Sequence, residues 1–148
     1  IQQEGTFSPN GKYNFKINNK NSEATDIIFT SWIKDIDAVL PGLEVVALAS
    51  LNEGTPVSLI EAQAAGIPIV STRVGGIEDV VIENKTALLS DKRDVAAFNN
   101  NLTKLINNKT LRDLFSKNGL SNVKEKFSYN RLVSDMKMLY NKLLSDVK

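Results

Sequence analysis

The chain has 148 residues, of which 42% are hydrophobic and 24% are charged, a composition typical of one globular domain with a core of its own. Its formal net charge is +1, without a long basic run, so we expect no nucleic-acid partner. Cysteine and histidine are both absent, which excludes disulfides and a thiolate nucleophile and removes the commonest general base and metal ligand.

The sequence contains no apolar stretch long enough to span a bilayer and no recognisable signal peptide. Together with the absence of cysteine, this predicts a cytoplasmic protein. The first residue is Ile1 rather than methionine, and we therefore expect the chain to be part of a longer protein.

Residues 1–24 are set apart from the rest of the sequence. A Pro-Asn-Gly turn is followed by the alternating apolar residues Tyr13, Phe15 and Ile17, a pattern that predicts a β-hairpin over residues 5–17. A polar, turn-rich stretch comes next. We treat residues 1–24 as an unassigned segment and place the main domain at residues 25–148.

The main domain opens with a short predicted strand over residues 26–30, followed by Trp32 and Ile33 and then by a short helix that ends near Pro41. The next run, GLEVVALAS, is almost continuously apolar. It predicts a strand over residues 44–49 that is covered on both faces, as in a parallel sheet.

Residues 50–72 combine a loop, a helix and a strand. Thr55 is a favourable N-cap, and Pro56 then falls at the first helical position, where a missing N–H costs nothing. Gly66 predicts the end of this helix, because glycine readily adopts the left-handed conformation that follows many helices. The strand over residues 68–72 follows at once.

Two glutamates stand out in this unit. Glu53 lies in the loop before the helix, and Glu61 lies in a helix whose other residues are mostly apolar or small. Thr55 and Glu61 are roughly 9 Å apart along the helix axis, but the side chain of Glu61 leans back toward the helix N-terminus. Taken singly, Glu61 would be an ordinary solvent-facing helix residue and Glu53 an ordinary loop residue.

The combination of both glutamates with a helix N-terminus predicts a particular kind of ligand. A helix N-terminus offers free N–H groups and a partial positive charge, which suit a phosphate or diphosphate. Carboxylates suit vicinal sugar hydroxyls, whose hydrogen bonds they accept. A nucleotide-sugar, with a diphosphate at its centre and a sugar at each end, meets both requirements.

A double glycine, Gly75 and Gly76, follows the strand over residues 68–72 and precedes a short helix. Two glycines after a strand allow a close backbone approach to a ligand. Their spacing is not that of the G-x-G-x-x-G fingerprint of dinucleotide-binding proteins, so the main sequence evidence for a dehydrogenase is missing. A further strand is predicted over residues 87–90.

From Asp91 onward the chain is predicted to be helical, with a break at Asn118 and Gly119. The first of these helices is expected to bury one apolar face, formed by Val95, Phe98, Leu102, Leu105 and Ile106. The last is expected to bury another, formed by Leu132, Met136, Leu139, Tyr140 and Leu143.

Four segments of the main domain form a recognisable pattern: Glu53-Gly54-Thr55-Pro56, Glu61-Ala62, the run GIPIV, and Val74-Gly75-Gly76-Ile77. With these segments the chain resembles the retaining GT-B glycosyltransferases of group 1, whose hallmark is two glutamates separated by seven residues. The resemblance covers about residues 26–147. It implies an α/β fold: a Rossmann-like parallel sheet with helices on both faces and a helical C-terminus, as in the C-terminal half of a GT-B fold, incomplete here.

The resemblance also implies roles for single residues. Glu53 would be the catalytic residue and contact the hydroxyls of the donor sugar, while Glu61 would hold the nucleotide ribose. Other donor-binding positions would surround the diphosphate or line the same site: Gly54, Thr55, Pro56, Val57, Gly75 and Gly76. Trp32 or Ile33 would cover the nucleotide base, although Trp32 could equally be a half-buried cap on the core.

The implied activity is transfer of a hexose from a nucleotide diphosphate-sugar to an acceptor, with retention and without a cofactor or metal, in polysaccharide or glycoconjugate synthesis. The family's acceptor-binding N-terminal domain is missing from this sequence, and so is the basic pair that neutralises the diphosphate. Arg73 is a candidate partial substitute for that pair. We therefore expect this chain alone to be inactive, and a peripheral membrane contact of the full-length protein stays open.

Two alternatives to a glycosyltransferase remain at this point. One is a non-catalytic domain that binds a nucleotide-sugar, and the other is a GT-B-like nucleotide-sugar epimerase. The sequence identifies neither the donor base and sugar nor the acceptor.

Overall fold

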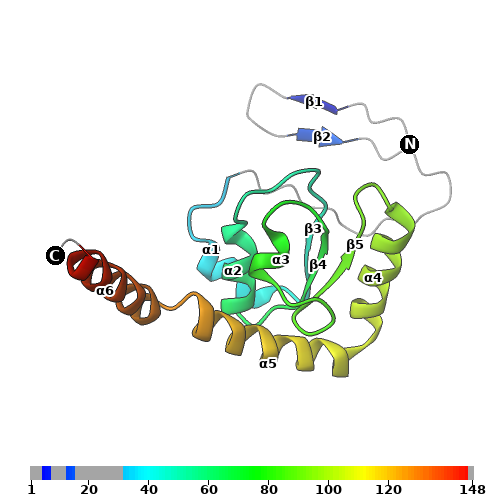
Figure 1. The fold of residues 1–148 in the computed structure, drawn as a ribbon. Helices are drawn as coiled ribbons and strands as arrows, with labels where there is room; N and C mark the ends of the chain where they lie inside the picture. Colours follow the sequence, from blue (N-terminus) through cyan, green and yellow to red (C-terminus); the bar gives the residue numbers. More distant parts are fainter. Residues whose placement is uncertain (1–4, 8–12, 16–31, 147–148) are drawn as a thin grey trace. The chain divides into compact units, whose positions relative to one another are not determined.

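The computed structural model describes residues 5–7, 13–15 and 32–146 (Figure 1). The chain divides into two compact units, Ile1–Ile36 and Asp37–Lys148. In the first unit, β1 (Gly5–Phe7) and β2 (Tyr13–Phe15) pair in antiparallel fashion with Gly5 opposite Phe15, as a hairpin over residues 5–17 requires. The strand predicted over residues 26–30 lies outside the described residues.

The second unit is built on a parallel sheet of three strands in the order β3-β4-β5. These strands are β3 (Val46–Leu48), β4 (Ile69–Thr72) and β5 (Ala87–Ser90). Val46 lies opposite Ile69, and Ile69 lies opposite Ala87. The strands predicted for this part of the sequence are therefore confirmed, although β3 is shorter than expected.

Helices connect successive strands, and the chain after β5 is also helical. In chain order the helical elements are α1 (Ile36–Val39), the 3-10 turn η1 (Leu40–Gly42), α2 (Val57–Ala64), α3 (Ile77–Val80), α4 (Val95–Asn107), α5 (Lys109–Lys126) and α6 (Tyr129–Asp146). None of the helices in this part of the chain is both long and apolar enough to cross a membrane.

The sheet is covered on both faces, and successive side chains of β4 point into two different apolar clusters. Ile69 packs with Leu59 of α2 and Ile77 of α3. The next residue, Val70, packs with Leu105 of α4 and Phe115 of α5 on the other face. This alternation follows from the two-residue period of a strand, and it confirms the predicted Rossmann-like fold class with helices on both faces.

Gly66 ends α2 as predicted. Its φ is +73°, which is the left-handed region. The amide of Ile67 donates to the carbonyl of Ala62 at 2.9 Å, and the amide of Gly66 donates to that of Gln63 at 3.0 Å. This pair of hydrogen bonds is the Schellman arrangement, which satisfies the last carbonyls of the helix and turns the chain directly into β4.

The predicted helix break at Asn118 and Gly119 is wrong, because α5 runs without interruption from Lys109 to Lys126. Gly119 serves a tertiary contact instead. A Cβ atom placed on it would lie 3.3 Å from Cγ of Gln63, so the missing side chain lets α5 lie close against α2. Packing between helices outweighs the weak helix preference of a single glycine.

Two buried amides join α2 and α5 at this contact. Nε2 of Gln63 donates to the carbonyls of Leu59 and Val80, both at 3.1 Å. Nδ2 of Asn122 donates to Oε1 of Gln63 at 2.9 Å and to the same Val80 carbonyl at 3.0 Å. The network therefore ties α2, α5 and the end of α3 together without an unpaired amide oxygen on Gln63.

The buried faces predicted for α4 and α6 also need correction, and α4 is the first. In α4, Leu105 is buried and packs with Phe98 and Leu102, but Val95 is 77% and Ile106 54% exposed. Val95 borders an open hollow at the end of the sheet. Ile106 follows Leu105, and successive residues of a helix point about 100° apart, so Ile106 faces away when Leu105 faces the core.

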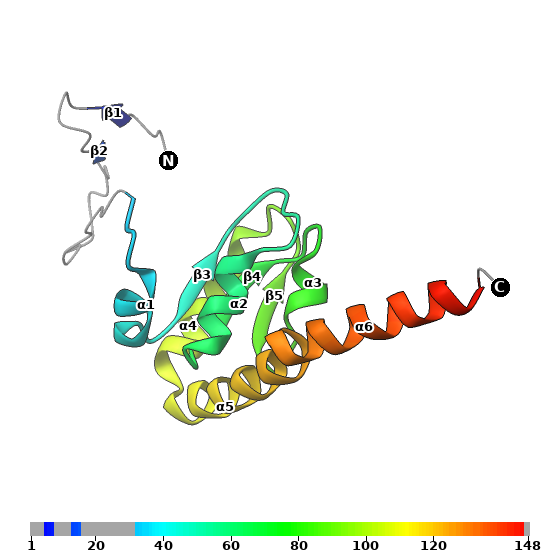
Figure 2. The ribbon, with the colours of Figure 1, turned by 90° about the vertical axis from the view of Figure 1, so that its left-hand side faces the viewer.

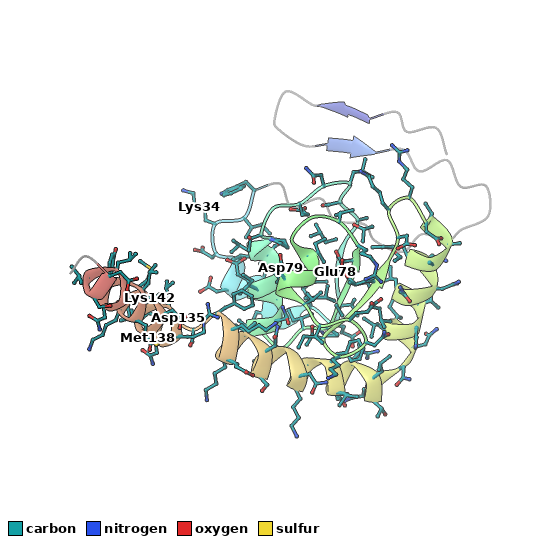
Figure 3. All side chains as sticks on the ribbon, viewed as in Figure 1. Lys34, Glu78, Asp79, Asp135, Met138 and Lys142 are labelled. Atoms are coloured by element: carbon teal, nitrogen blue, oxygen red, sulfur yellow. The ribbon has the colours of Figure 1, made fainter. Side chains whose placement is uncertain are left out.

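The apolar side chains of α6 are not buried. Their exposed fractions range from 40% for Met136 to 58% for Tyr140; the residues predicted as buried were Leu132, Met136, Leu139, Tyr140 and Leu143. Among the described elements none packs closely along α6, and Figure 2 shows it continuing beyond the end of α5, away from the sheet. Figure 3 shows the side chains of Asp135, Met138 and Lys142 projecting from it.

The buried amide network makes a prediction for stability. Asn122→Ala leaves the Gln63 oxygen without its donor in a buried site, so the free energy of unfolding should fall by about 1–3 kcal/mol. The control is Asn118→Ala on the same helix, whose amide makes one hydrogen bond at the surface, to the carbonyl of Lys85; its cost should be about 0.5 kcal/mol. Urea denaturation measures both, and equal losses would contradict the role given to the network.

Candidate functional site

The loops that follow β3 and β4 meet at the carboxyl edge of the sheet. In Figure 1 they lie at its upper end, while α5 crosses the opposite end. The amide of Gly76 donates to the carbonyls of Glu53 and Gly54, at 3.3 and 3.1 Å. The structure thus brings together four residues that the sequence analysis selected from two separate segments.

The double glycine is required by this contact between two stretches of backbone. A Cβ atom on Gly75 would lie 1.8 Å from the carbonyl oxygen of Glu53, and one on Gly76 would lie 2.3 Å from that of Gly54. Gly75 also has a φ of +51°, which disfavours any residue with a side chain. The sequence predicts that these glycines approach a ligand; the close approach found here is to the neighbouring loop.

Glu53 is held at its side chain as well as at its backbone. Oγ of Ser50 donates to Oε1 of Glu53 at 2.5 Å. The carbonyl of Ser50 in turn accepts a hydrogen bond from Oγ1 of Thr72 at 2.6 Å. Neither Ser50 nor Thr72 was expected from the sequence, because a hydrogen bond between two loop side chains and one between neighbouring strands leave no local sequence pattern.

The N-terminus of α2 opens at the same edge of the sheet, but it starts one residue later than predicted. The N-cap is the buried Pro56 rather than Thr55, and no side chain caps the helix. The amide of Leu59 reaches back to the Pro56 carbonyl at 3.0 Å. Thr55, Val57 and Ser58 are exposed, so α2, whose leading amides have no partner within the helix, begins at the surface.

Glu61 lies one turn after Val57 and is exposed. Its neighbours Leu59, Ala62 and Gln63 form the buried side of α2. Within the part of the chain that the structure describes, the carboxylate of Glu61 makes no hydrogen bond or ion pair. It is thus accessible to a ligand, and its role in binding ribose stays a prediction.

Arg73 does not offer a free positive charge for a diphosphate. Its guanidinium contacts Glu78 at 2.5 Å, Glu83 at 2.7 Å and Asp91 at 3.5 Å. Hydrogen bonds to Glu83 and then to Glu78 raise the pKa of Arg73 above its ordinary value. Figure 3 shows Glu78 on α3. Three carboxylates already neutralise this cation, so the idea that it substitutes for a basic pair is not supported.

Trp32 and Ile33 belong to the first unit, Ile1–Ile36, whereas Glu53 and Glu61 belong to the second. Trp32 is 87% exposed, and the alternative of a half-buried cap on the core stays open. Covering a nucleotide base stays a prediction for both residues.

A hollow of about 330 Å³ lies beside the same edge of the sheet, on the side of α4. It is lined by Ala49, Leu51, Thr72, Arg93, Asp94, Val95 and Phe98. No pattern in the sequence marks this set of residues as a site. Within residues 32–146, no three acidic side chains gather closely enough to hold a metal ion.

Comparison with known proteins identifies the family. Residues 10–121 match Glycosyl transferases group 1, and the chain belongs to this family. It is 28% identical over 121 residues to the capsular polysaccharide biosynthesis glycosyltransferase CapM of Staphylococcus aureus, covering 82% of this chain and 32% of CapM.

Two further proteins bear on the fold and the chemistry. The chain is 27% identical over 140 residues to the UDP-Gal:alpha-D-GlcNAc-diphosphoundecaprenol alpha-1,3-galactosyltransferase of Escherichia coli, covering 95% of this chain and 35% of that protein. The sucrose-phosphate synthase of Thermosynechococcus elongatus has a similar structure, with a TM-score of 0.69 and 26% identity over 75% of this chain and 28% of that one. The chain thus spans about a third of the length of its curated relatives.

The contact between the two loops makes a second prediction. In Gly75→Ala the new Cβ overlaps the Glu53 carbonyl, so the free energy of unfolding should fall by about 1–3 kcal/mol, and amide exchange should rise over residues 53–55. The control is Gly42→Ala, because a Cβ on Gly42 has no atom within 4 Å. If Gly75→Ala were as stable as the control, the backbone contact would not constrain the loop as described.

Proposed function

We propose that this chain is the donor-binding part of a retaining glycosyltransferase. It would bind a nucleotide diphosphate-sugar at the carboxyl edge of the sheet for transfer of the sugar to an acceptor. The observation that carries the proposal is the junction of Glu53, the double glycine and the open N-terminus of α2, with an accessible Glu61 one turn further on. Membership of the group 1 family and the UDP-Gal donor in the name of the Escherichia coli relative support it.

The diphosphate would sit at the N-terminus of α2. Gly54, Thr55 and Val57 are exposed residues there, and the helix dipole adds partial positive charge. Negative charge grows on the diphosphate as the bond to the sugar breaks. Fixed amides that need no reorganisation stabilise that charge more than water does.

The two glutamates would bind the two sugars of the donor. Glu53, in the loop beside Gly75 and Gly76, would accept hydrogen bonds from the transferred sugar, and Glu61 would accept them from the ribose. Hydrogen bonds to a carboxylate are stronger than those between neutral groups. Trp32 or Ile33 would cover the base.

Transfer also requires an acceptor held in reacting geometry, since positioning supplies a large share of the rate. The chain spans about a third of its curated relatives, and the acceptor site and a basic pair for the diphosphate would lie in the remainder of the full-length protein. We expect neither a cofactor nor a metal. By itself the chain would bind a nucleotide-sugar weakly and transfer no sugar.

The first functional prediction concerns Glu61. In the full-length protein, Glu61→Gln should weaken binding of a nucleoside diphosphate by about 1–3 kcal/mol, the scale of hydrogen bonds to a charged group. Calorimetry measures this with whichever of UDP, GDP, ADP and dTDP the wild-type protein binds best. Glu125→Gln, which changes an exposed glutamate of α5, is the control. An unchanged dissociation constant for Glu61→Gln would refute the ribose role.

The second functional prediction separates Glu53 from Glu61. Glu53→Gln should lower turnover by about 100-fold or more, the cost of losing one charged contact to the transition state, while the affinity for the bare nucleoside diphosphate stays nearly the same. The measurement combines initial rates with calorimetry on the same samples. Equal losses of affinity for the nucleotide and the nucleotide-sugar would show that Glu53 does not act on the transferred sugar.

A further inference from the structure

We propose that Ser50 is a positioning residue that fixes the direction of the Glu53 carboxylate. The proposal rests on the function proposed above, in which Glu53 contacts the hydroxyls of the transferred sugar. Ser50 lies outside the two-glutamate motif. Its hydrogen bond would hold the Glu53 carboxylate in one orientation before the donor binds.

Ser50 is itself held in place by the sheet. It follows β3, and its carbonyl accepts the hydrogen bond from Oγ1 of Thr72 at 2.6 Å. Thr72 ends β4 and is only 6% exposed. Its neighbour Ser71 ties the same two strands together, with Oγ donating to the carbonyl of Leu48 at 3.0 Å. The backbone of Ser50 is therefore anchored to the neighbouring strand, which distinguishes it from a freely rotating surface serine.

The hydroxyl of Ser50 connects Glu53 to this anchored backbone. It donates to Oε1, while the amide of Gly76 holds the Glu53 carbonyl from the other side. Glu53 is thus fixed at its main chain by one loop and at its carboxylate by another residue. A free glutamate side chain loses up to about 2 kcal/mol of rotamer entropy when it is ordered. With the Ser50 hydrogen bond, part of that ordering is complete before the donor binds.

The same hydrogen bond leaves the carboxylate able to bind a sugar. Each carboxylate oxygen accepts about two hydrogen bonds, and Ser50 occupies one position on Oε1. Among the residues that the structure describes, Oε2 has no hydrogen-bond partner. Glu53 is half-buried rather than enclosed. The free positions suit two adjacent hydroxyl groups, such as those of a hexose.

A purely structural role for Ser50 makes different predictions from a positioning role. If Ser50 only stabilised the loop, its removal would lower the melting temperature and the affinity for the nucleoside diphosphate together. If Ser50 acts through Glu53, its removal lowers turnover, leaves the affinity for the bare nucleoside diphosphate unchanged, and has no further effect once the Glu53 carboxylate is gone.

The experiment uses the full-length protein and the donor that the wild type hydrolyses fastest from UDP-, GDP-, ADP- and dTDP-linked hexoses. Water is the acceptor in this assay: its oxygen bonds to the anomeric carbon and one of its protons is released to the solvent. The bond from that carbon to the diphosphate oxygen breaks, and the free sugar and the nucleoside diphosphate leave, of which the nucleoside diphosphate is measured. Ser50→Ala should lower kcat by about 10- to 100-fold, the range found when a residue that orients a metal ligand is removed. Ser50→Thr, which keeps the hydroxyl, should restore most of the rate.

Two controls isolate the effect. Ser145→Ala removes a serine hydroxyl that donates to the backbone carbonyl of Lys142 in α6 and not to Glu53, and it should leave kcat unchanged. The double variant Ser50→Ala with Glu53→Gln should be no slower than Glu53→Gln alone, because residues acting through one group are not additive. Should Ser50→Ala fail to fold, Ser50→Cys decides, since it keeps the size with a much weaker donor and should lower kcat in the same direction.

The outcomes separate this inference from the proposed function. If Glu53→Gln loses turnover and Ser50→Ala or Ser50→Cys does not, the positioning role is overturned and the proposed function stands. Losses that multiply in the double variant overturn it as well, because Ser50 would then act independently of Glu53. If no donor is hydrolysed by the wild type, or Glu53→Gln keeps full activity, the proposed role of Glu53 has failed, and with it the basis of this inference.

Discussion

The candidate site depends on one contact, in which the backbone of Gly75 and Gly76 lies directly against the backbone of Glu53 and Gly54. Neither glycine leaves room for a Cβ atom, so the approach of the two loops is set by main-chain atoms rather than by adaptable side chains. This contact sets the position of the Glu53 backbone relative to the loop after β4. The Ser50 hydroxyl then fixes its carboxylate. The role proposed for Glu53 needs support of this kind, because small displacements of a reacting residue lower the rate steeply.

The contact is only as rigid as the elements that carry the two loops. Both loops start from adjacent parallel strands in register, and the sheet places their carboxyl ends side by side, where ligands of open α/β folds bind. Between the loops, α2 is held on the sheet by Leu59 and Ala62, and on α5 by the paired amides of Gln63 and Asn122. The contact between α2 and α5 thus helps to hold the loops of the candidate site in place at the edge of the sheet.

Local patterns in the sequence predicted the elements around the site, and contacts between distant residues explain where the prediction failed. The apolar runs at β3, β4 and β5 and the glycine that ends α2 follow from rules that act within a few residues. Gly119 was read as a helix break because its partner, Gln63, lies on another helix. Arg73 looked like an available cation because Glu83 and Asp91 join it only in the folded chain. The apolar stripe on α6 was assigned to the core, since a sequence shows which face is apolar but not whether anything covers it.

A crystal structure of the full-length protein with a bound nucleotide-sugar tests the central claim most directly. The account predicts the diphosphate within hydrogen-bonding distance of the amides at the start of α2, the ribose hydroxyls on Glu61, and the transferred sugar on the oxygen of Glu53 that Ser50 leaves free. A donor bound away from Glu53 and the start of α2, for example in the hollow between Leu51 and Phe98, with Glu53 and Glu61 both facing water, would contradict it.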